Sequence, residues 1–208
     1  MPIQLHIIYG LKFEIIRVTE TVKLLPWYRE RGYGENHVRL PAGITEESTA
    51  EDIERVVAAE FDASGYEAVA EYLTSQWEVH AAGFVPMKSV AAFAWRDSFE
   101  VVLTKYGSGG SFDVGKGRVI VNIATREREK LVGTITHEII HMLIQHMIKA
   151  NNVSHWRKER LVDLIGAKYF PKLLNRKQLT PEDVSMIDQA FKAHSIDEIE
   201  VTIQELGA

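Results

Sequence analysis

The chain contains no cysteine among its 208 residues. This absence excludes a disulfide framework, and it also excludes the thiolate ligands that hold many structural zinc ions. The remaining side chains that bind transition metals are histidine, aspartate and glutamate, and the chain has 8 histidines and 29 acidic residues. Any metal site must therefore be built from nitrogen and oxygen atoms.

The chain also lacks an excess of positive charge, a long apolar run and a recognisable leader. Its formal net charge is −5, so no general field attracts nucleic acid or an anionic membrane surface. No apolar run reaches the roughly 18 residues of a membrane-spanning helix. Residues 1–9 show no basic segment followed by an apolar stretch and a cleavage site. We therefore expect a cytoplasmic protein that has neither nucleic acid nor membrane as a partner.

The most informative feature that is present is His137-Glu138-Ile139-Ile140-His141, the H-E-x-x-H pattern of zinc peptidases. On an α-helix, residues four apart are displaced by only about 40° around the axis, so both imidazoles can reach one ion. Glu138 lies about 100° further round than His137, where its carboxylate can act as a general base without becoming a ligand. The pattern predicts a metal-dependent hydrolase.

The surroundings of the motif favour this interpretation over chance. Residues 118–123 have the composition of a short apolar strand, and after a polar break a long helical pattern carries the two histidines. The alternative is an amphipathic helix whose apolar face merely happens to include them. That face is formed by Leu131, Ile135, Ile139, Met142 and Ile148.

The first half of the chain predicts a mixture of strands and helices. Residues 3–18 alternate in polarity and predict a strand, a bend and a second strand. Helices are predicted after Ser48 or Thr49, which can cap an apolar stripe ending at Phe61, and again over residues 66–79. The aromatic residues of this half are expected in the core: Trp27, Tyr28, Tyr33, Tyr66, Tyr72 and Trp77.

The second half begins with a β-type pattern over residues 91–106, followed by a glycine-rich loop that ends at Phe112. This loop is either a flexible hairpin tip or the rim of a substrate cleft, because glycines let another backbone approach closely. After the motif helix, Ser154 can cap a helix that ends before Pro171. A last helix is predicted from Thr180, followed by a strand or an extended tail.

These patterns divide the chain into three parts. Residues 1–95 form an α+β region without an assigned role, residues 96–175 carry the motif, and residues 176–208 form a helical tail. At this length we expect one sizeable core, with or without an appended subdomain.

A catalytic zinc ion usually has three protein ligands and one water, so the two histidines need a partner from elsewhere. Four downstream residues are candidates. His146 lies roughly 140° from the metal-facing side of the motif helix and is better interpreted as a packing or surface residue. His155 falls at the start of the next helix. Glu159 and Asp163 share one face of that helix because they are four residues apart.

Glu159 follows His141 by 18 residues and opens the sequence E-x-x-x-D. Together with the motif, this segment resembles the glutamate-type zincins, or gluzincins, the clan of thermolysin-like metallopeptidases. The resemblance covers about residues 119–163, and the compactness of the chain is similar to that of the small members of the clan. It implies that Glu159 is the third zinc ligand and that Asp163 supports a ligand histidine, as a carboxylate behind an imidazole does.

The chain departs from the clan's usual pattern at Lys158, which stands where an asparagine precedes the ligand glutamate. The longer metzincin pattern is not met, because Ile144 and Met147 stand where it needs glycine and histidine. No distant histidine equivalent to the clan's oxyanion-stabilising residue is identified. The candidates for oxyanion or substrate contacts are Tyr106, His155 and Tyr169.

The resemblance implies an α+β, zincin-like fold, in which a small, mostly antiparallel sheet lies over the motif helix and a second helix supplies the third ligand. It implies a zinc-dependent metallopeptidase that acts on a peptide or protein substrate. Zn²⁺ would be bound by His137, His141 and Glu159, with Glu138 as the general base. Two alternatives remain open: a non-catalytic zincin-like module that binds a protein partner, and a latent peptidase whose C-terminal segment covers the cleft.

Overall fold

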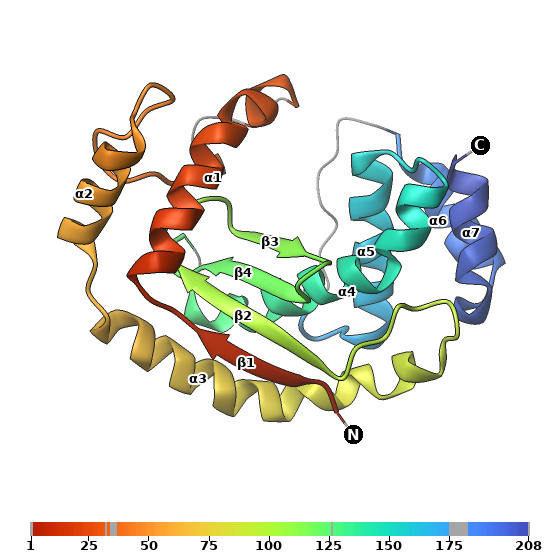
Figure 1. Ribbon diagram of the computed structural model, residues 1–208. Helices are drawn as coiled ribbons and strands as arrows, with labels where there is room; N and C mark the ends of the chain where they lie inside the picture. Colours follow the sequence, from red (N-terminus) through yellow and green to blue (C-terminus); the bar gives the residue numbers. More distant parts are fainter. Residues whose placement is uncertain (1, 32, 34–36, 126, 175–182, 208) are drawn as a thin grey trace.

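The computed structural model describes residues 2–31, 33, 37–125, 127–174 and 183–207. In this part of the chain, seven α-helices and one four-stranded sheet form an α+β fold (Figure 1). The strands are β1 (Gln4–Ile8), β2 (Ser98–Thr104), β3 (Gly110–Asp113) and β4 (Arg118–Asn122). The helices are α1 (Leu11–Glu30), α2 (Ala50–Glu60), α3 (Ser64–His80), α4 (Leu131–Ala150), α5 (His155–Tyr169), α6 (Ser185–Ala193) and α7 (Ile199–Gly207).

The sheet has the strand order β1-β2-β4-β3, and it is mixed. β1, β2 and β4 run parallel, with Val101 of β2 between Ile7 and Val119, whereas β3 is antiparallel to β4. The prediction of a mostly antiparallel sheet is therefore wrong. Parallel neighbours need long crossover connections, and here three helices separate β1 from β2. The alternation of residues within each strand does not reveal that connection.

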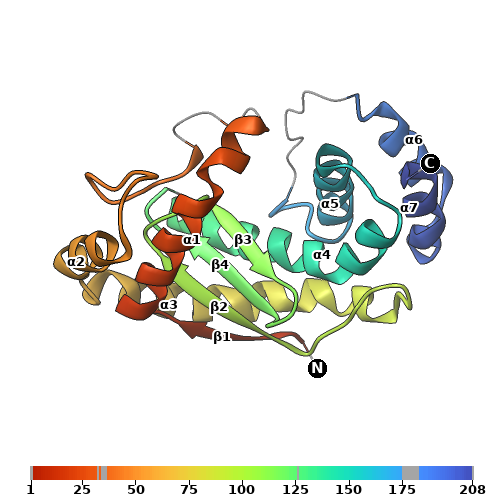
Figure 2. The ribbon, with the colours of Figure 1, turned by 45° about the horizontal axis from the view of Figure 1, so that its top comes forward.

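Helices cover both faces of the sheet. α3 and α4 lie against one face, and α1 lies on the opposite side next to β2, as Figure 2 shows. The core between the sheet and α3 and α4 contains alternate residues of the central strands: Phe99, Val101, Leu103, Val119 and Val121. α5 and α7 pack against α4, and the C-terminal helices bury Ile187, Ile199 and Ile203 in the same core. These helices are therefore part of the main fold.

The N-terminal prediction is partly wrong. β1 is a strand, but the second strand expected within residues 3–18 is the beginning of the 20-residue helix α1. The buried residues of this helix have helical spacing: Glu14, Arg17, Val18, Thr21 and Val22. Because this buried face includes a carboxylate and a guanidinium group, the apolar residues alone do not show the 3.6-residue period.

The predicted cap of α2 is confirmed. The side chain of Thr49 accepts a hydrogen bond from the backbone N–H of Asp52, and the Asp52 carboxylate accepts one from the backbone N–H of Thr49. This reciprocal pair is a capping box. The second predicted helix is also present, as α3.

The predictions for the C-terminal third have mixed outcomes. Ser154 caps α5 by accepting from the backbone N–H of Arg157, and the helix ends before Pro171 as expected. The final residues form the helix α7 and not a strand or an extended tail. Thr180, the expected start of a helix, lies outside the described residues.

The sheet connects the predicted N-terminal region to the part that carries the motif. β1 pairs with β2, with Leu5 opposite Phe99, and a second apolar cluster joins α1 and α2 to Tyr106 after β2. Among the described residues, no helix has the length and apolar character needed to cross a membrane.

Candidate metal centre

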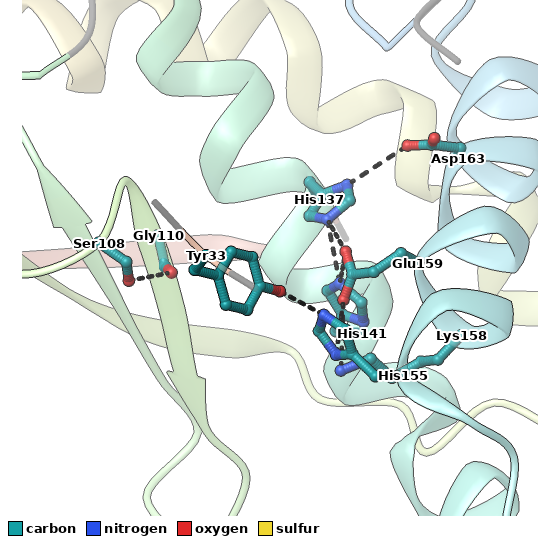
Figure 3. A network of polar contacts seen from close by, with 9 residues as sticks. All are labelled: Tyr33, Ser108, Gly110, His137, His141, His155, Lys158, Glu159 and Asp163. Carbon is teal, nitrogen blue, oxygen red and sulfur yellow. Dashed lines mark hydrogen bonds and ion pairs between the residues drawn. The ribbon is translucent and has the colours of Figure 1, made fainter. Parts of the chain in front are cut away.

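The two motif histidines lie one turn apart on α4, and Glu159 faces them from α5 (Figure 3). Between these helices, Asn152 adopts a φ of 51°, a left-handed conformation that asparagine tolerates, and α5 folds back beside α4. Nε2 of His141 is 3.0 Å from Nε2 of His137. Oε2 of Glu159 is 3.3 Å from each of these nitrogen atoms. The structure thus brings the two histidines and the predicted third ligand together.

The spacing and chemistry of these three atoms fit a tetrahedral metal ion. Ligand atoms at about 2.0–2.1 Å from zinc in tetrahedral directions lie about 3.3–3.4 Å apart, close to the separations found here. A carboxylate oxygen and two imidazole nitrogens can each donate a lone pair to a metal cation. His137, His141 and Glu159 therefore form a group that could hold a metal ion.

The charges of the group are consistent with that role. Burial lowers the pKa of His141 to about 4, so its imidazole is neutral near pH 7 and offers a lone pair. Burial would raise the pKa of Glu159, but the adjacent His141 and His137 outweigh it and lower that pKa. Burial also opposes charge on His137, yet the nearby carboxylates, Glu159 foremost, raise its pKa. A metal ion would displace the His137 proton and take over its role in balancing the carboxylates.

The outer nitrogens of the two histidines have different surroundings. Nδ1 of His137 is 3.9 Å from Oδ1 of Asp163, so the carboxylate to which the resemblance gives a supporting role lies behind this imidazole. Nδ1 of His141 is buried and has no hydrogen-bond partner among the described residues. Its ring instead stacks on Phe112 of β3, with centroids 5.3 Å apart and planes 16° apart. Packing therefore orients His141, whereas a carboxylate faces His137.

Glu138 is buried beside the edge strand β3. Gly110, the first residue of β3, lies so close that a Cβ there would be 2.5 Å from Oε1 of Glu138 and 2.7 Å from Cγ2 of Thr134. Only glycine permits this approach without a shift of the carboxylate. The glycine-rich loop thus contributes directly to the surroundings of the predicted general base.

A cavity of about 680 Å³ surrounds the metal centre. β3 and the loop before it form one wall, and the first residues of α5 form another. A further wall is aromatic and comes from the end of α1 and the residues that follow: Trp27, Tyr28, Tyr33 and His37. Three of these four had been expected in the core, so the sequence did not reveal this wall.

Tyr33 connects the aromatic wall to the metal centre. Its hydroxyl group forms a hydrogen bond with Nε2 of His155, which is 122 positions away in the sequence. Burial and the charge of Glu159 raise the pKa of Tyr33 to about 12, so the phenol stays protonated. No local sequence pattern could have indicated this residue, because its place in the cavity depends on a contact between segments that are 122 positions apart.

The other predicted contact residues lie in different places. His155 lines the cavity, with Nδ1 3.8 Å from Oε1 of Glu159. Tyr106 belongs to the apolar cluster between α1 and α2, and its hydroxyl group donates to Glu60. Tyr169 is at the C-terminal end of α5 and, like Tyr106, is not among the residues that line the cavity. His146 is exposed on α4, as expected for a surface residue.

A second group of buried polar residues lies beneath the glycine-rich loop. We call it the loop-anchoring cluster, and it consists of Glu14, Arg17, Tyr66 and Ser108. The carboxylate of Glu14 accepts a hydrogen bond of 2.7 Å from the backbone N–H of Lys105 and another from the hydroxyl group of Tyr66. Helices α1 and α3 thereby hold the end of β2.

Arg17 continues this cluster under the loop itself. Its guanidinium group donates to Oγ of Ser108 at 3.0 Å and to the carbonyl oxygen of Tyr106 at 3.4 Å. Oγ of Ser108 donates in turn to the carbonyl oxygen of Gly110 at 3.0 Å. Gly107 has a φ of 81°, and a Cβ there would be 2.1 Å from Nε of Arg17. The loop therefore wraps closely around a buried cation.

Comparisons with known proteins do not identify the chain. Neither a family model, nor a curated protein, nor a solved structure matches it. The function must be inferred from the site itself.

Proposed function

We propose that the protein is a zinc-dependent metallopeptidase of the gluzincin type, with a zincin-like arrangement of sheet and motif helix. The observation that carries this proposal is the convergence of His137, His141 and Glu159 beside the buried carboxylate of Glu138. Two imidazoles and one carboxylate leave one position of a tetrahedral ion open, which is typical of catalytic and not of structural zinc. The nitrogen and oxygen donors suit zinc, although other first-row divalent ions accept the same ligands.

Glu138 would carry the proton in this reaction. A zinc ion at the centre supplies Lewis acidity, which makes a water molecule more acidic and polarises the carbonyl group of the substrate. Glu138 accepts the proton of the attacking water, and it donates that proton to the amine released when the peptide C–N bond breaks. Gly110 leaves space for this carboxylate, because a Cβ there would be 2.5 Å from Oε1 of Glu138. His155 and Tyr33 are polar groups of the same cavity that can contact the substrate carbonyl oxygen.

β3 would bind the substrate backbone. Among the described strands its one neighbour is β4, so its other edge has backbone groups that can pair with an extended peptide. Residues 108–112, which include the first three residues of β3, line the cavity.

The test is to incubate the zinc-loaded protein with a peptide library and to detect the cleavage products by mass spectrometry. We expect wild type to cleave, and Glu138→Gln to retain zinc while losing about 10²- to 10⁴-fold in rate, the usual contribution of a general base. Glu129→Gln, which changes another cavity carboxylate, is the matched control and should keep its activity. Full activity of Glu138→Gln, or equal cleavage after zinc removal, would contradict the proposal.

The same experiment addresses the alternatives. Zinc binding without cleavage of any peptide would favour a non-catalytic module that binds a protein partner. A latent peptidase covered by its C-terminal helices has less support, because Ile187, Ile199 and Ile203 are buried in the core. Removal of these helices would expose apolar core residues, so truncation is not a clean test of latency.

A further inference from the structure

Lys158 lies on α5 directly before Glu159, and it lines the same cavity (Figure 3). Its Nζ is 3.3 Å from Oε1 of Glu159, the oxygen that does not face the two histidines. The same Nζ is 5.7 Å from the centre of the Phe112 ring on β3. Only 16% of the side chain is exposed. The ammonium group of a largely buried side chain therefore lies between the proposed metal ligands and the edge strand.

The protein balances this charge only in part. An ammonium group has three N–H donors, and among the described residues the one acidic group within ion-pair distance of Lys158 is Glu159. A divalent cation bound to Oε2 of Glu159 would be attracted by the same single negative charge that attracts Lys158. Asp163 faces His137 on the other side of the centre. With metal bound, Lys158 would thus have unused donors that face the space for substrate.

The other lysines of the cavity differ from Lys158. Nζ of Lys130 pairs with the carboxylate of Glu127, and 41% of the Lys130 side chain is exposed. Lys172 is also exposed. Exposed ammonium groups are well hydrated and contribute little to recognition. Lys158 is the lysine whose position combines burial with proximity to the metal ligands.

We propose that Lys158 determines specificity by binding a carboxylate of the substrate next to the scissile bond, so that the enzyme prefers acidic peptides. The inference rests on the proposed function, because it requires a peptide to bind at the metal. A charge-assisted hydrogen bond in a partly dehydrated cavity is stronger than one at the surface. The carboxylate can belong to an acidic side chain or to the C-terminus of the peptide, and these two sources are distinguished below.

The test uses uncleavable peptide hydroxamates, which bind zinc, in two matched pairs. In the first pair the residue beside the hydroxamate is aspartate or asparagine. In the second pair that residue is alanine, and the peptide ends in a free carboxylate or in an amide. The first pair is prepared with the peptide on either side of the hydroxamate, and the second only with the peptide on its C-terminal side, where the peptide keeps a C-terminus of its own. Affinities are measured by calorimetry on zinc-loaded wild type, Lys158→Met, Lys158→Arg and Lys130→Met, and the zinc content of each sample is measured in parallel.

We expect wild type to prefer the charged member of one pair by about tenfold, the effect of one additional charge-assisted contact. This ratio should fall to about one in Lys158→Met, remain in part in Lys158→Arg and remain fully in the control Lys130→Met. The test depends on the ratio of the two affinities and not on either affinity alone, because Lys158 also contacts Glu159, a proposed metal ligand. A lysine that only oriented Glu159 would change the affinity for both members of a pair equally.

The outcomes separate this inference from the proposed function. If zinc-loaded wild type binds the charged and the uncharged hydroxamate of each pair with equal affinity, the proposed role of Lys158 is overturned. The proposed peptidase is not affected by this outcome. A preference that persists in Lys158→Met, or that is lost in Lys130→Met, would overturn it as well. Wild type that holds no zinc and binds no hydroxamate would instead refute the proposed peptidase, and the inference with it.

Discussion

The candidate metal centre and the loop-anchoring cluster are both buried and polar, and they are built in opposite ways. At the metal centre, His137, His141 and Glu159 direct potential acceptor atoms toward one point, at separations of 3.0–3.3 Å. In the loop-anchoring cluster donors meet acceptors, as where the guanidinium group of Arg17 donates to Ser108. The first cluster could hold a cation among its acceptors, whereas the second pairs donors with acceptors through its own hydrogen bonds, Oε2 of Glu14 excepted.

This difference shows that burial of charged residues does not by itself indicate a functional site. Glu14 and Glu159 are both buried carboxylates on helices. Burial raises the pKa of Glu14 despite its hydrogen bonds. Burial acts on Glu159 in the same direction, but the adjacent imidazoles reverse the effect and lower its pKa. A carboxylate kept ionised by other metal-binding side chains is what a cation site requires.

The largest contrast between the clusters is expected when a ligand is removed. His141→Ala and Glu159→Ala each delete one of three ligand atoms, and zinc affinity should fall by more than the roughly 100-fold typical of outer-shell changes. Glu14→Ala removes a carboxylate of similar burial and should leave the zinc content unchanged while it lowers stability. Plasma mass spectrometry of protein purified without chelator measures the metal. About one zinc per chain in His141→Ala would contradict the assignment.

A smaller effect is expected at Gly110, where the two clusters meet. A Cβ at this position would be 2.5 Å from Oε1 of Glu138, so Gly110→Ala should displace the general base and slow peptide cleavage about 10²-fold. The zinc content should not change, because no ligand moves directly. Gly65→Ala is the control, since a Cβ there would contact nothing within 4 Å. Unchanged cleavage by Gly110→Ala would show that Glu138 has room to adjust.

A change at Arg17 perturbs the loop-anchoring cluster and replaces no residue of the candidate metal centre. Arg17→Met leaves Oγ of Ser108 without its donor, whereas the carbonyl oxygen of Tyr106 keeps the hydrogen bond that it accepts from Oγ1 of Thr104. An unsatisfied buried group costs about 1–3 kcal/mol, so the free energy of unfolding in urea should fall by about that amount. Arg17→Lys, which retains a donor, should lose less. Loss of zinc without loss of stability would contradict the separation of the two clusters.

The part of the candidate metal centre that depends on local spacing, the pair of histidines on α4, could be predicted from the sequence. His137 and His141 share a face by the helical repeat, and the cap at Ser154 sets where the next helix begins. That α5 folds back beside α4 did not follow from spacing alone. The resemblance to gluzincins supplied Glu159, and the structure places this residue next to the histidines.

The rest of the site depends on contacts between distant segments, which local patterns do not encode. Tyr33 reaches His155 across 122 positions, and Arg17 reaches Ser108 across 91. Burial of Glu14 and Arg17 on α1 even concealed the helix, because polar residues occupy its inner face. The mixed sheet was missed for a similar reason, since each strand alternates in the same way whether its neighbours are parallel or antiparallel.

The smallest predicted effect concerns the pH dependence of stability at Glu14. Burial raises the pKa of this carboxyl group above 4.5 in the folded state, so the folded protein holds the proton more tightly than the unfolded chain does. Below pH 4.5 the proton is bound in both states. As the pH rises from 4.5 to the folded pKa, stability should fall by up to about 1.4 kcal/mol per pH unit, and it should level off above that pKa.

Glu14→Gln isolates this effect because glutamine does not titrate. The free energy of unfolding of wild type minus that of Glu14→Gln should decrease between pH 4 and pH 7.5, as measured by urea unfolding of metal-free protein. Titration of the metal-binding residues contributes equally to both proteins and cancels in the difference. Glu129→Gln, the same substitution at an exposed carboxylate, is measured in parallel as a control for the exchange of glutamate for glutamine. A difference that increases with pH would mean that the Glu14 carboxylate is stabilised as an ion, and the contrast with Glu159 would then fail.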